Sequence, residues 1–377
     1  MLKPSLILVV LIGTGWAVTV TEHIELMRFP PKLVTKETIL NDYEILSDEF
    51  YRPEDPTRNE VIQLAYVTPW NNKGYDLAKK TAHKLSHVSP VWFQVKPLMK
   101  GETLDTCLIT GDHDIDRDWI NALRGKNSNI KIVPRIIFED WSRQQMEVLL
   151  VNTQFSNKCA RVISDFYLRN QFDGLVVELY TQAVVTMQSL EVKTFLVETM
   201  EQLAKVFHKS ELQVIFTIPA PLDGKMQPNQ MIDTDEYSSL LKVADYLQIM
   251  TYDFRGPKLT GVAPFEWVES CLFYLDPKRS KKTLLGINWY GYEYTEKHMK
   301  PIIGDQFISA LKEKPILFYN FDEEAMEHRL YTKDKEVIYY PSLSSLELRI
   351  NLAHRSDAGI AIWDYGQGLP YFSNLLV

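Results

Sequence analysis

The chain has 377 residues, of which 45% are hydrophobic and 24% are charged. This composition is typical of a globular protein that is long enough to bury a large core. Lysine and arginine number 41 against 49 aspartate and glutamate residues, which gives a formal net charge of −8. Nucleic acid is therefore not expected as a partner, because phosphate binding depends on clustered cations.

Residues 1–17 predict a secretory signal peptide. Lys3 supplies a positive charge, and Ser5 to Ile12 are mostly Leu, Ile and Val. Gly15 and Ala17 then place small residues at the −3 and −1 positions of a cleavage site. A retained membrane anchor is the alternative, but it needs about 18 or more consecutive apolar residues. This run is shorter, so we expect a secreted protein without a membrane span.

The three cysteines, Cys107, Cys159 and Cys271, do not form a disulfide framework. At most one bond can form among them, and one thiol is then left over. Their spacing does not resemble a metal site. We expect neither a metal nor another cofactor.

Residues 18–60 are charged and interrupted by prolines, with no sustained hydrophobic period. They predict an N-terminal extension ahead of a main body at 61–377. In that body, eight short apolar runs alternate with helical patterns such as Cys159–Leu168 and Phe195–Phe207. The runs are Ile62–Val67, Val88–Val95, Ile130–Phe138, Gly174–Leu179, Leu212–Ile218, Tyr246–Met250, Leu284–Ile287 and Gly359–Trp363.

Strands of this kind, alternating with helices, indicate a parallel sheet that is covered on both faces. Eight such units predict an α/β protein with a (β/α)8 TIM barrel. A doubly wound open sheet is the alternative, but no Gly-x-Gly-x-x-Gly turn follows the first strand.

The interval between Tyr290 and Leu343 is too long for a single crossover helix. It contains strand-like runs at Ile316–Phe321 and Val337–Tyr340. We predict a small α+β insertion at about residues 291–342, after the seventh strand. Its aromatic content argues against a long disordered loop.

Motifs at the strand ends resemble those of the family-18 glycoside hydrolases, over roughly residues 61–377. Phe172-Asp173-Gly174 opens the fourth strand, and the run from Met250 to Phe254 (Met-Thr-Tyr-Asp-Phe) ends the sixth. Supporting motifs lie at residues 285–291 and 359–363. The resemblance implies the chitinase fold, with its site at the carboxyl ends of the strands.

Three further runs, at residues 65–70, 138–141 and 366–369, look like the secreted chitinase domain-containing protein 1 group. That group is a non-catalytic, chitinase-like lineage. The resemblance implies secretion or lysosomal residence, and a sorting receptor as a partner.

In the catalytic family the fourth strand reads Asp-Gly-x-Asp-x-Asp-x-Glu. The final Glu protonates the glycosidic oxygen while the N-acetyl group of the substrate attacks the anomeric carbon. The Asp173-Gly174 register assigns the three last positions to Val176, Glu178 and Tyr180, and alternation predicts that all three point into the barrel mouth. A phenol with a pKa near 10 cannot replace an acid tuned to about 6. The sequence therefore predicts that the catalytic acid is lost at Tyr180.

Glu178 is the alternative acid, with Asp253 and Asp364 as further candidates for a hydrolase with an unusual substrate. Glu178 lies about 6.6–6.8 Å deeper along the strand than position 180. It is better placed to anchor an acetamide or to pair with Tyr252 and Arg135. A core carboxylate balanced by Arg135, with no ligand contact, is an equal alternative.

Aromatic residues cluster at the predicted strand ends, where sugar rings could stack on them. The resemblance places Trp363 beneath the sugar and Tyr252 and Asp253 at its acetamide. The acidic pair Glu139-Asp140 either lines the cleft or caps the helix after Trp141. The predicted ligand-binding set is Trp70, Trp92, Glu139, Asp140, Trp141, Glu178, Tyr180, Met250, Tyr252, Asp253, Asn288, Tyr290 and Trp363.

The sequence thus favours a secreted, catalytically inactive, chitinase-like protein that binds oligosaccharides containing N-acetylglucosamine, such as chitin fragments. A role in glycan or pathogen sensing would suit such a protein. The competing hypotheses are an active hydrolase and a protein-interaction module. In the last case the aromatic runs at 318–321 and 339–340 would form a partner surface, although they could equally be the core of the insertion.

Overall fold

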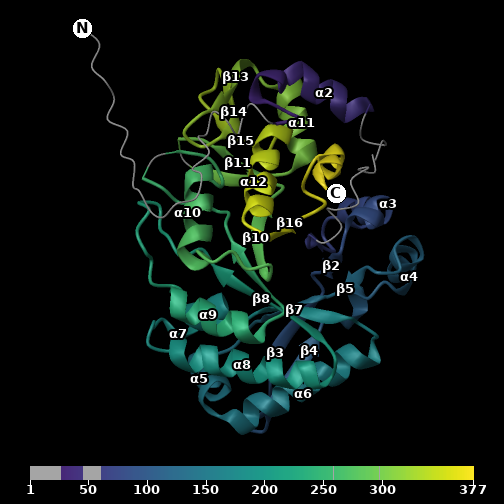
Figure 1. Cartoon of the computed structure of the whole chain (residues 1–377), viewed down its shortest axis with the longest axis vertical. Coiled ribbons are helices and arrows are strands. Elements are labelled where there is room, and N and C mark those ends of the chain that lie inside the picture. The colour runs from purple at the N-terminus through teal and green to yellow at the C-terminus, as the bar shows by residue number, and fades with distance from the viewer. Residues whose placement is uncertain (1–26, 46–60, 258, 297) are drawn as a thin grey trace.

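The computed structural model describes residues 27–45, 61–257, 259–296 and 298–377 (Figure 1). The predicted signal peptide and most of the predicted N-terminal extension lie outside these residues.

The eight predicted apolar runs form the strands of an α/β barrel, so the predicted fold class is confirmed. The second and third runs are each divided into two short strands. In chain order the barrel strands are β1 (Gln63–Val67), β2 (His87–Pro90), β3 (Phe93–Lys100), β5 (Lys131–Ile132), β6 (Arg135–Phe138), β7 (Gly174–Glu178), β8 (Gln213–Pro219), β9 (Tyr246–Met250), β10 (Thr283–Asn288) and β16 (Gly359–Trp363).

Parallel pairing connects these strands in the order β3-β6-β7-β8-β9-β10-β16-β1-β2-β5. The ring closes between β5 and β7, where the Asp173 amide donates to the Ile132 carbonyl at 2.9 Å and the Val176 amide to the Pro134 carbonyl at 3.2 Å. Pro134 separates β5 from β6, since proline has no N–H to continue the ladder.

Helices lie around the barrel strands (Figure 1). The amphipathic patterns at Cys159–Leu168 and Phe195–Phe207 fall within α6 and α8, as predicted. The helices of the barrel are α3 (Lys73–Thr81), α4 (Arg117–Lys126), α5 (Arg143–Val151), α6 (Thr153–Arg169), α7 (Tyr180–Met187), α8 (Lys193–Lys209), α9 (Thr234–Val243), α10 (Phe265–Leu275) and α12 (Leu343–Arg355).

A second, five-stranded sheet follows β10 and lies at the top of Figure 1. It contains β11 (Gly291–Tyr294), β12 (Met299–Ile302), β13 (Ile316–Asp322), β14 (Glu327–Thr332) and β15 (Val337–Tyr339), together with helix α11 (Gly304–Glu313). Its strands pair in the antiparallel order β12-β11-β15-β14-β13. Tyr339 and Tyr340 are buried, whereas Phe318 is 44% exposed and stacks on Tyr331. Most of the aromatic runs therefore belong to the insertion's own core.

The described part of the N-terminal extension packs on the body as a short 3-10 turn (Pro31–Leu33) and helix α2 (Lys36–Ile45). The sequence did not predict this helix. Glu347 on α12 accepts hydrogen bonds from the amides of Arg28 at 3.0 Å and Phe29 at 2.9 Å. Ile39 is buried against the body.

An unpredicted strand, β4 (Thr103–Thr110), pairs with β3 in an antiparallel hairpin. Cys107 on β4 forms a disulfide with Cys159 on α6, and Cys271 is a buried free thiol. The pairing that the sequence left open is thus a single bond that fastens the hairpin to a barrel helix. Among the described helices, none combines the length and the apolar character needed to cross a bilayer.

Candidate functional site: the barrel mouth

Glu178 ends strand β7 and forms an ion pair with Arg135 of the neighbouring strand β6. The distance from Glu178 Oε2 to Arg135 Nε is 2.8 Å, and the two side chains are 19% and 13% exposed. Strand pairing brings the two residues together, because Arg135 is in register with Val176, two positions before Glu178. The pairing with Arg135, one of the two interpretations of Glu178, is therefore present.

A second polar group joins strands β1 and β9 and the loop that follows β9. The hydroxyl of Tyr66 on β1 donates to Gln248 Oε1 on β9, and Gln248 Nε2 donates to the Tyr252 hydroxyl at 3.2 Å. Burial, with a smaller contribution from the Glu178 charge, raises the pKa of Tyr252 above its usual value. Its hydroxyl therefore stays protonated and acts as a neutral hydrogen-bonding group.

Asp253 is fixed by tyrosines from the insertion side. It has a positive φ of 60°, and its Oδ1 accepts hydrogen bonds from the hydroxyls of Tyr290 and, at 2.7 Å, Tyr292. Asn288 Nδ2 donates to the Tyr290 carbonyl at 2.8 Å. The end of the sixth barrel strand and the start of the insertion thus form one hydrogen-bonded unit.

Trp363, the last residue of β16, lies between the barrel interior and the insertion. Its ring meets Tyr66 edge-on, with centroids 5.2 Å apart. It packs both on the apolar cluster inside the barrel and on the cluster that contains Tyr290 and Tyr292. It remains half-buried, so part of its ring is accessible.

A pocket of about 380 Å³ opens beside Tyr252, at the carboxyl ends of β8 and β9. This volume is within the usual range for small-ligand sites. Trp267 Nε1 donates to the Leu222 carbonyl at 3.0 Å and so joins α10 to the loop after β8. The lining residues are Pro219, Ala220, Leu222, Asp223, Gly224, Asn229, Met250, Tyr252, Asp253, Phe254, Arg255 and Trp267.

Tyr180 does not point into the mouth, and that prediction was wrong. Strand β7 ends at Glu178, Leu179 has helical backbone angles, and Tyr180 is the first residue of α7. The alternation of side chains holds only while the chain stays extended. The Tyr180 hydroxyl instead donates to the Met231 carbonyl at 2.9 Å and contacts Glu236, and the side chain is fully buried.

Two of the predicted stacking residues are core residues. Trp92 has no exposed surface, and its Nε1 donates to the Tyr75 hydroxyl at 2.7 Å. Trp141 is buried, and its Nε1 donates to the Val95 carbonyl at 2.8 Å. Neither ring can stack on a sugar in this structure. Their indole N–H groups are satisfied by the protein itself.

The remaining predicted residues lie on exposed loops. Trp70 is 69% exposed after β1. Glu139 and Asp140 are exposed after β6, and Asp140 pairs with Lys96 at 2.7 Å. Neither acid caps the next helix, because Ser142 is the N-cap of α5. The structure therefore brings together Glu178, Met250, Tyr252, Asp253, Asn288, Tyr290 and Trp363, and not the other six members of the predicted set.

Several residues of the mouth were not in the predicted set. Gln248 could have been found, because it is a polar residue inside the apolar run Tyr246–Met250. Tyr292 and Arg255 gave no comparable signal, since their positions depend on how the insertion folds. Among the described residues, no group of three or more histidine, cysteine or acidic side chains is arranged to hold a metal ion.

The fold is an α/β barrel with an insertion after β10, and a comparison with family models identifies the family of barrels to which it belongs. The model of family 18 of the glycosyl hydrolases matches residues 63–368. This chain belongs to that family.

One curated relative is an uncharacterized glycosylase, YvbX, of Bacillus subtilis. It is 23% identical over 182 residues, which are 44% of this chain and 51% of the relative. This chain spans about half the length of the curated relatives it matches.

Solved structures of chitinases and chitinase-like proteins share the fold. A chitinase from Chromobacterium violaceum superposes with a TM-score of 0.69 at 19% identity, covering 84% of this chain and 97% of its own. Human YKL-39, described as a pseudo-chitinase with retained chitooligosaccharide binding properties, gives 0.66 at 17% identity, covering 84% and 98%. At these identities the likeness concerns the fold alone.

Proposed function

We propose that the protein binds oligosaccharides containing N-acetylglucosamine, such as chitin fragments, in the barrel mouth without hydrolysing them. The observation that carries the proposal is the Glu178–Arg135 ion pair. In the register that Asp173-Gly174 sets, Tyr180 takes the position expected of the acid, and its hydroxyl donates to the Met231 carbonyl instead of facing the mouth. Glu178, two residues earlier at the end of β7, is a paired carboxylate facing a cation.

The groups retained in the mouth suit sugar binding. The accessible part of Trp363 offers an aromatic surface for the C–H face of a sugar ring. Tyr252 and Asp253 line the pocket at the ends of β8 and β9 and supply a hydroxyl and a carboxylate for hydrogen bonds to an acetamide or a sugar hydroxyl. YKL-39, which shares this fold, is described as a pseudo-chitinase with retained chitooligosaccharide binding properties, and this supports the proposal of binding without hydrolysis.

Titration calorimetry with chito-oligosaccharides of increasing length tests the binding. We expect heat of binding and a raised melting temperature, since a ligand that binds only the folded state stabilises it. No heat and no thermal shift at any chain length would contradict the proposal. A panel of other bacterial and fungal glycans would then show whether binding suits a role in glycan or pathogen sensing.

A hydrolase is the second candidate, and Asp364 provides a specific reason to test it. Burial raises the pKa of Asp364 to about 6, within the range useful for a general acid. The carboxylate is, however, fully buried and accepts hydrogen bonds from Thr68 and from the amides of Gly366 and Gln367. A fluorogenic N-acetylglucosaminide assay from pH 4 to pH 8 separates the candidates, because turnover lost in Asp364→Asn would support the hydrolase.

We also propose that the protein is secreted, with lysosomal delivery by a sorting receptor as an extension that rests on resemblance. Residues 1–17 have the pattern of a signal peptide. The Cys107–Cys159 disulfide suits an oxidising compartment. Expression of the full chain in cultured cells should give a processed protein in the medium, and retention in the cytosol would contradict the proposal.

A further inference from the structure

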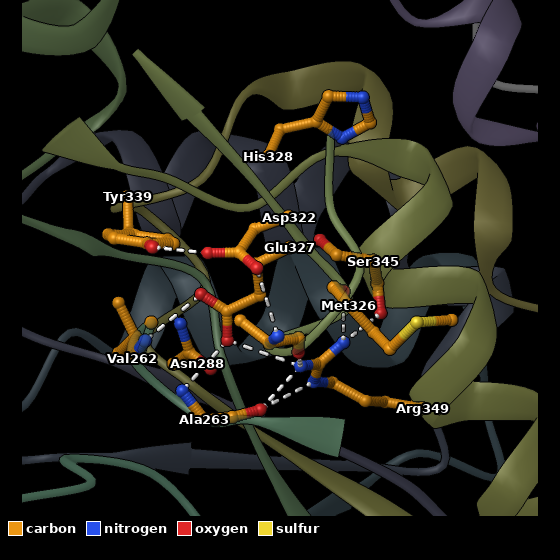
Figure 2. Close-up of polar contacts among 12 residues, drawn as sticks. Val262, Ala263, Asn288, Asp322, Met326, Glu327, His328, Tyr339, Ser345 and Arg349 are labelled. Atoms are coloured by element: carbon orange, nitrogen blue, oxygen red, sulfur yellow. Dashed lines mark hydrogen bonds and ion pairs between the residues drawn. The ribbon is translucent and has the colours of Figure 1, made fainter. Parts of the chain in front are cut away.

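The loop that carries Tyr252 and Asp253 is held at its far end by a buried ion pair outside the pocket. This loop runs from the end of β9 to the start of α10, and its described residues are 251–257 and 259–264. Glu327, the first residue of β14 in the insertion, accepts hydrogen bonds from two consecutive loop amides. Val262 N lies 2.9 Å from its Oε2, and Ala263 N lies 2.8 Å from its Oε1 (Figure 2).

Arg349 of α12 completes the anchor. It lies 3.1 Å from Glu327 Oε1 and also donates to the carbonyl of Ala263, to that of Met326 at 3.2 Å and to that of Ser345 at 2.7 Å (Figure 2). Both side chains are buried, at 3% and 6% exposure. A buried charge pair of this kind is held only where nearly all of its hydrogen-bonding groups are satisfied.

The anchor is connected to the pocket through the backbone of the loop. The Phe254 amide donates to the Val262 carbonyl at 2.9 Å, so the residue after Asp253 is tied directly to the residue held by Glu327. Phe254 also packs edge-on against Trp267, with centroids 5.3 Å apart, and both rings line the pocket. One continuous path thus leads from the insertion to the ligand-binding wall.

We propose that Glu327, through its pairing with Arg349, is a positioning residue for the barrel-mouth pocket: it fixes the loop 251–264 in the conformation that presents Tyr252 and Asp253. The insertion then acts on the ligand without touching it at this point. For its effect on affinity, this inference rests on the proposed carbohydrate-binding function.

Glu327→Gln is the direct test. The glutamine side chain has one acceptor oxygen instead of two, so it cannot accept hydrogen bonds from both loop N–H groups as the carboxylate does. In addition, the buried Arg349 loses its counter-charge. We expect affinity for a chito-oligosaccharide to fall about fivefold or more, the usual scale of coupling between distinct sites. Hydrogen exchange in residues 251–264 should become faster, and Trp267 fluorescence should change.

Glu347→Gln is a matched control. Glu347 is also buried, also accepts hydrogen bonds from two consecutive amides (Arg28 and Phe29), and also pairs with an arginine. It fixes the N-terminal segment instead of the loop. Its variant should lose thermal stability while affinity and exchange in residues 251–264 stay at wild-type values. Equal loss of affinity in both variants, or unchanged exchange in the loop of Glu327→Gln, would overturn the inference.

Gly261→Ala perturbs the same contact from the loop side, if Glu327→Gln does not fold. Gly261 has a positive φ of 92°, and a Cβ there would meet Glu327 Oε2 at 2.8 Å. It should also weaken binding and quicken exchange in the loop, and unchanged values for both would contradict the inference. If the wild-type protein binds no chito-oligosaccharide, the proposed function fails, whereas the exchange and fluorescence comparison still decides whether Glu327 positions the loop.

Discussion

The two ends of strand β7 each carry one acidic residue, and the protein holds them in different ways. Asp173, just before the strand, accepts hydrogen bonds from the Ile132 amide at 2.8 Å and from Arg124 Nη2 at 3.0 Å. Glu178, at the other end, forms an ion pair with Arg135 of the adjacent strand β6. The first carboxylate fastens neighbouring backbone, whereas the second is balanced by a side chain alone.

The same difference separates the two ends of the whole barrel. At the amino end, the buried ring of His87 contacts Gln213 Oε1 at 2.7 Å, and Asp245 accepts a hydrogen bond from the Val214 amide at 2.7 Å. At the mouth, Tyr252 and Trp363 remain half-buried. We infer that changes at the amino end act on unfolding, and that changes at the mouth act on ligand binding, as is usual for barrels of this type.

The largest expected effect is a loss of stability with acid at the amino end. Burial lowers the pKa of His87 to about 4, and the Gln213 contact only partly opposes this. An unfolded histidine has a pKa of about 6.5, so between pH 6.5 and pH 4 the unfolded state binds a proton that the folded state does not. Stability that is present above pH 6.5 should therefore fall by about 3 kcal/mol by pH 4.

Urea unfolding measured across this pH range checks the expectation. His87→Gln keeps a hydrogen-bonding side chain that does not titrate there, and should flatten part of the pH dependence. His328, which lies on β14 of the insertion and is also buried with its pKa lowered to about 4, should account for a second part of the pH dependence. A wild-type protein equally stable at pH 4 and pH 7 would contradict the expected contribution of the buried histidines to stability.

Asp173→Asn should destabilise the protein without lowering its affinity for the ligand. The change removes the charge that faces Arg124 and weakens the bond from the Ile132 amide, which should cost about 1–3 kcal/mol of unfolding free energy. Asp76→Asn is the control, because its pair with Lys79 is exposed and should contribute less than about 1 kcal/mol. Weaker ligand binding by Asp173→Asn would show that the two ends are not independent.

Trp363→Ala should have the opposite profile at the mouth. Loss of its accessible ring face should weaken chito-oligosaccharide binding by about 1–3 kcal/mol in titration calorimetry, the scale of a single important contact. Trp70→Ala sharpens the test, since Trp70 is exposed after β1 and belongs to neither of the two apolar clusters on which Trp363 packs. Equal losses of affinity in the two variants would show that the ligand site extends toward β1. Unchanged affinity in Trp363→Ala would show that Trp363 does not belong to the site.

Glu178→Gln should have the smallest effect on stability. The Glu178–Arg135 pair is 19% and 13% exposed and involves no backbone group, and glutamine keeps an oxygen that can accept a hydrogen bond from Arg135, so the unfolding free energy should change less than in Asp173→Asn. Thermal unfolding of Glu178→Gln beside Asp173→Asn measures the difference directly. A larger loss of unfolding free energy in Glu178→Gln than in Asp173→Asn would show that the Glu178–Arg135 pair stabilises the barrel more than the contacts of Asp173 do.

The strands of the barrel could be predicted because each is a short apolar run between helical patterns. The site was harder, because the exposure of a residue at a strand end depends on which loop covers it. Trp92 lies within the apolar run Val88–Val95 and Trp363 ends the run Gly359–Trp363, yet only Trp363 stays accessible. Tyr180 was misplaced because the start of α7 breaks the alternation of the strand.

Contacts between residues far apart in the chain could not be predicted from the sequence. Glu327 and the amides of Val262 and Ala263 are far apart along the chain, and no local pattern marks them as partners. The strand β4 and the helix α2 were missed because their sequences lack a clear period. The Glu178–Arg135 pair was anticipated, since neighbouring strands in register bring these two residues together.

The central claim is that the mouth binds a glycan and leaves it intact. The most direct test is to incubate a chito-oligosaccharide with the wild-type protein at a concentration that calorimetry has shown to saturate it, and to analyse the recovered sugar by chromatography. We expect bound sugar to be recovered at its original length, from wild type and Glu178→Gln alike. Shorter products from the wild type that disappear in Glu178→Gln would contradict the claim.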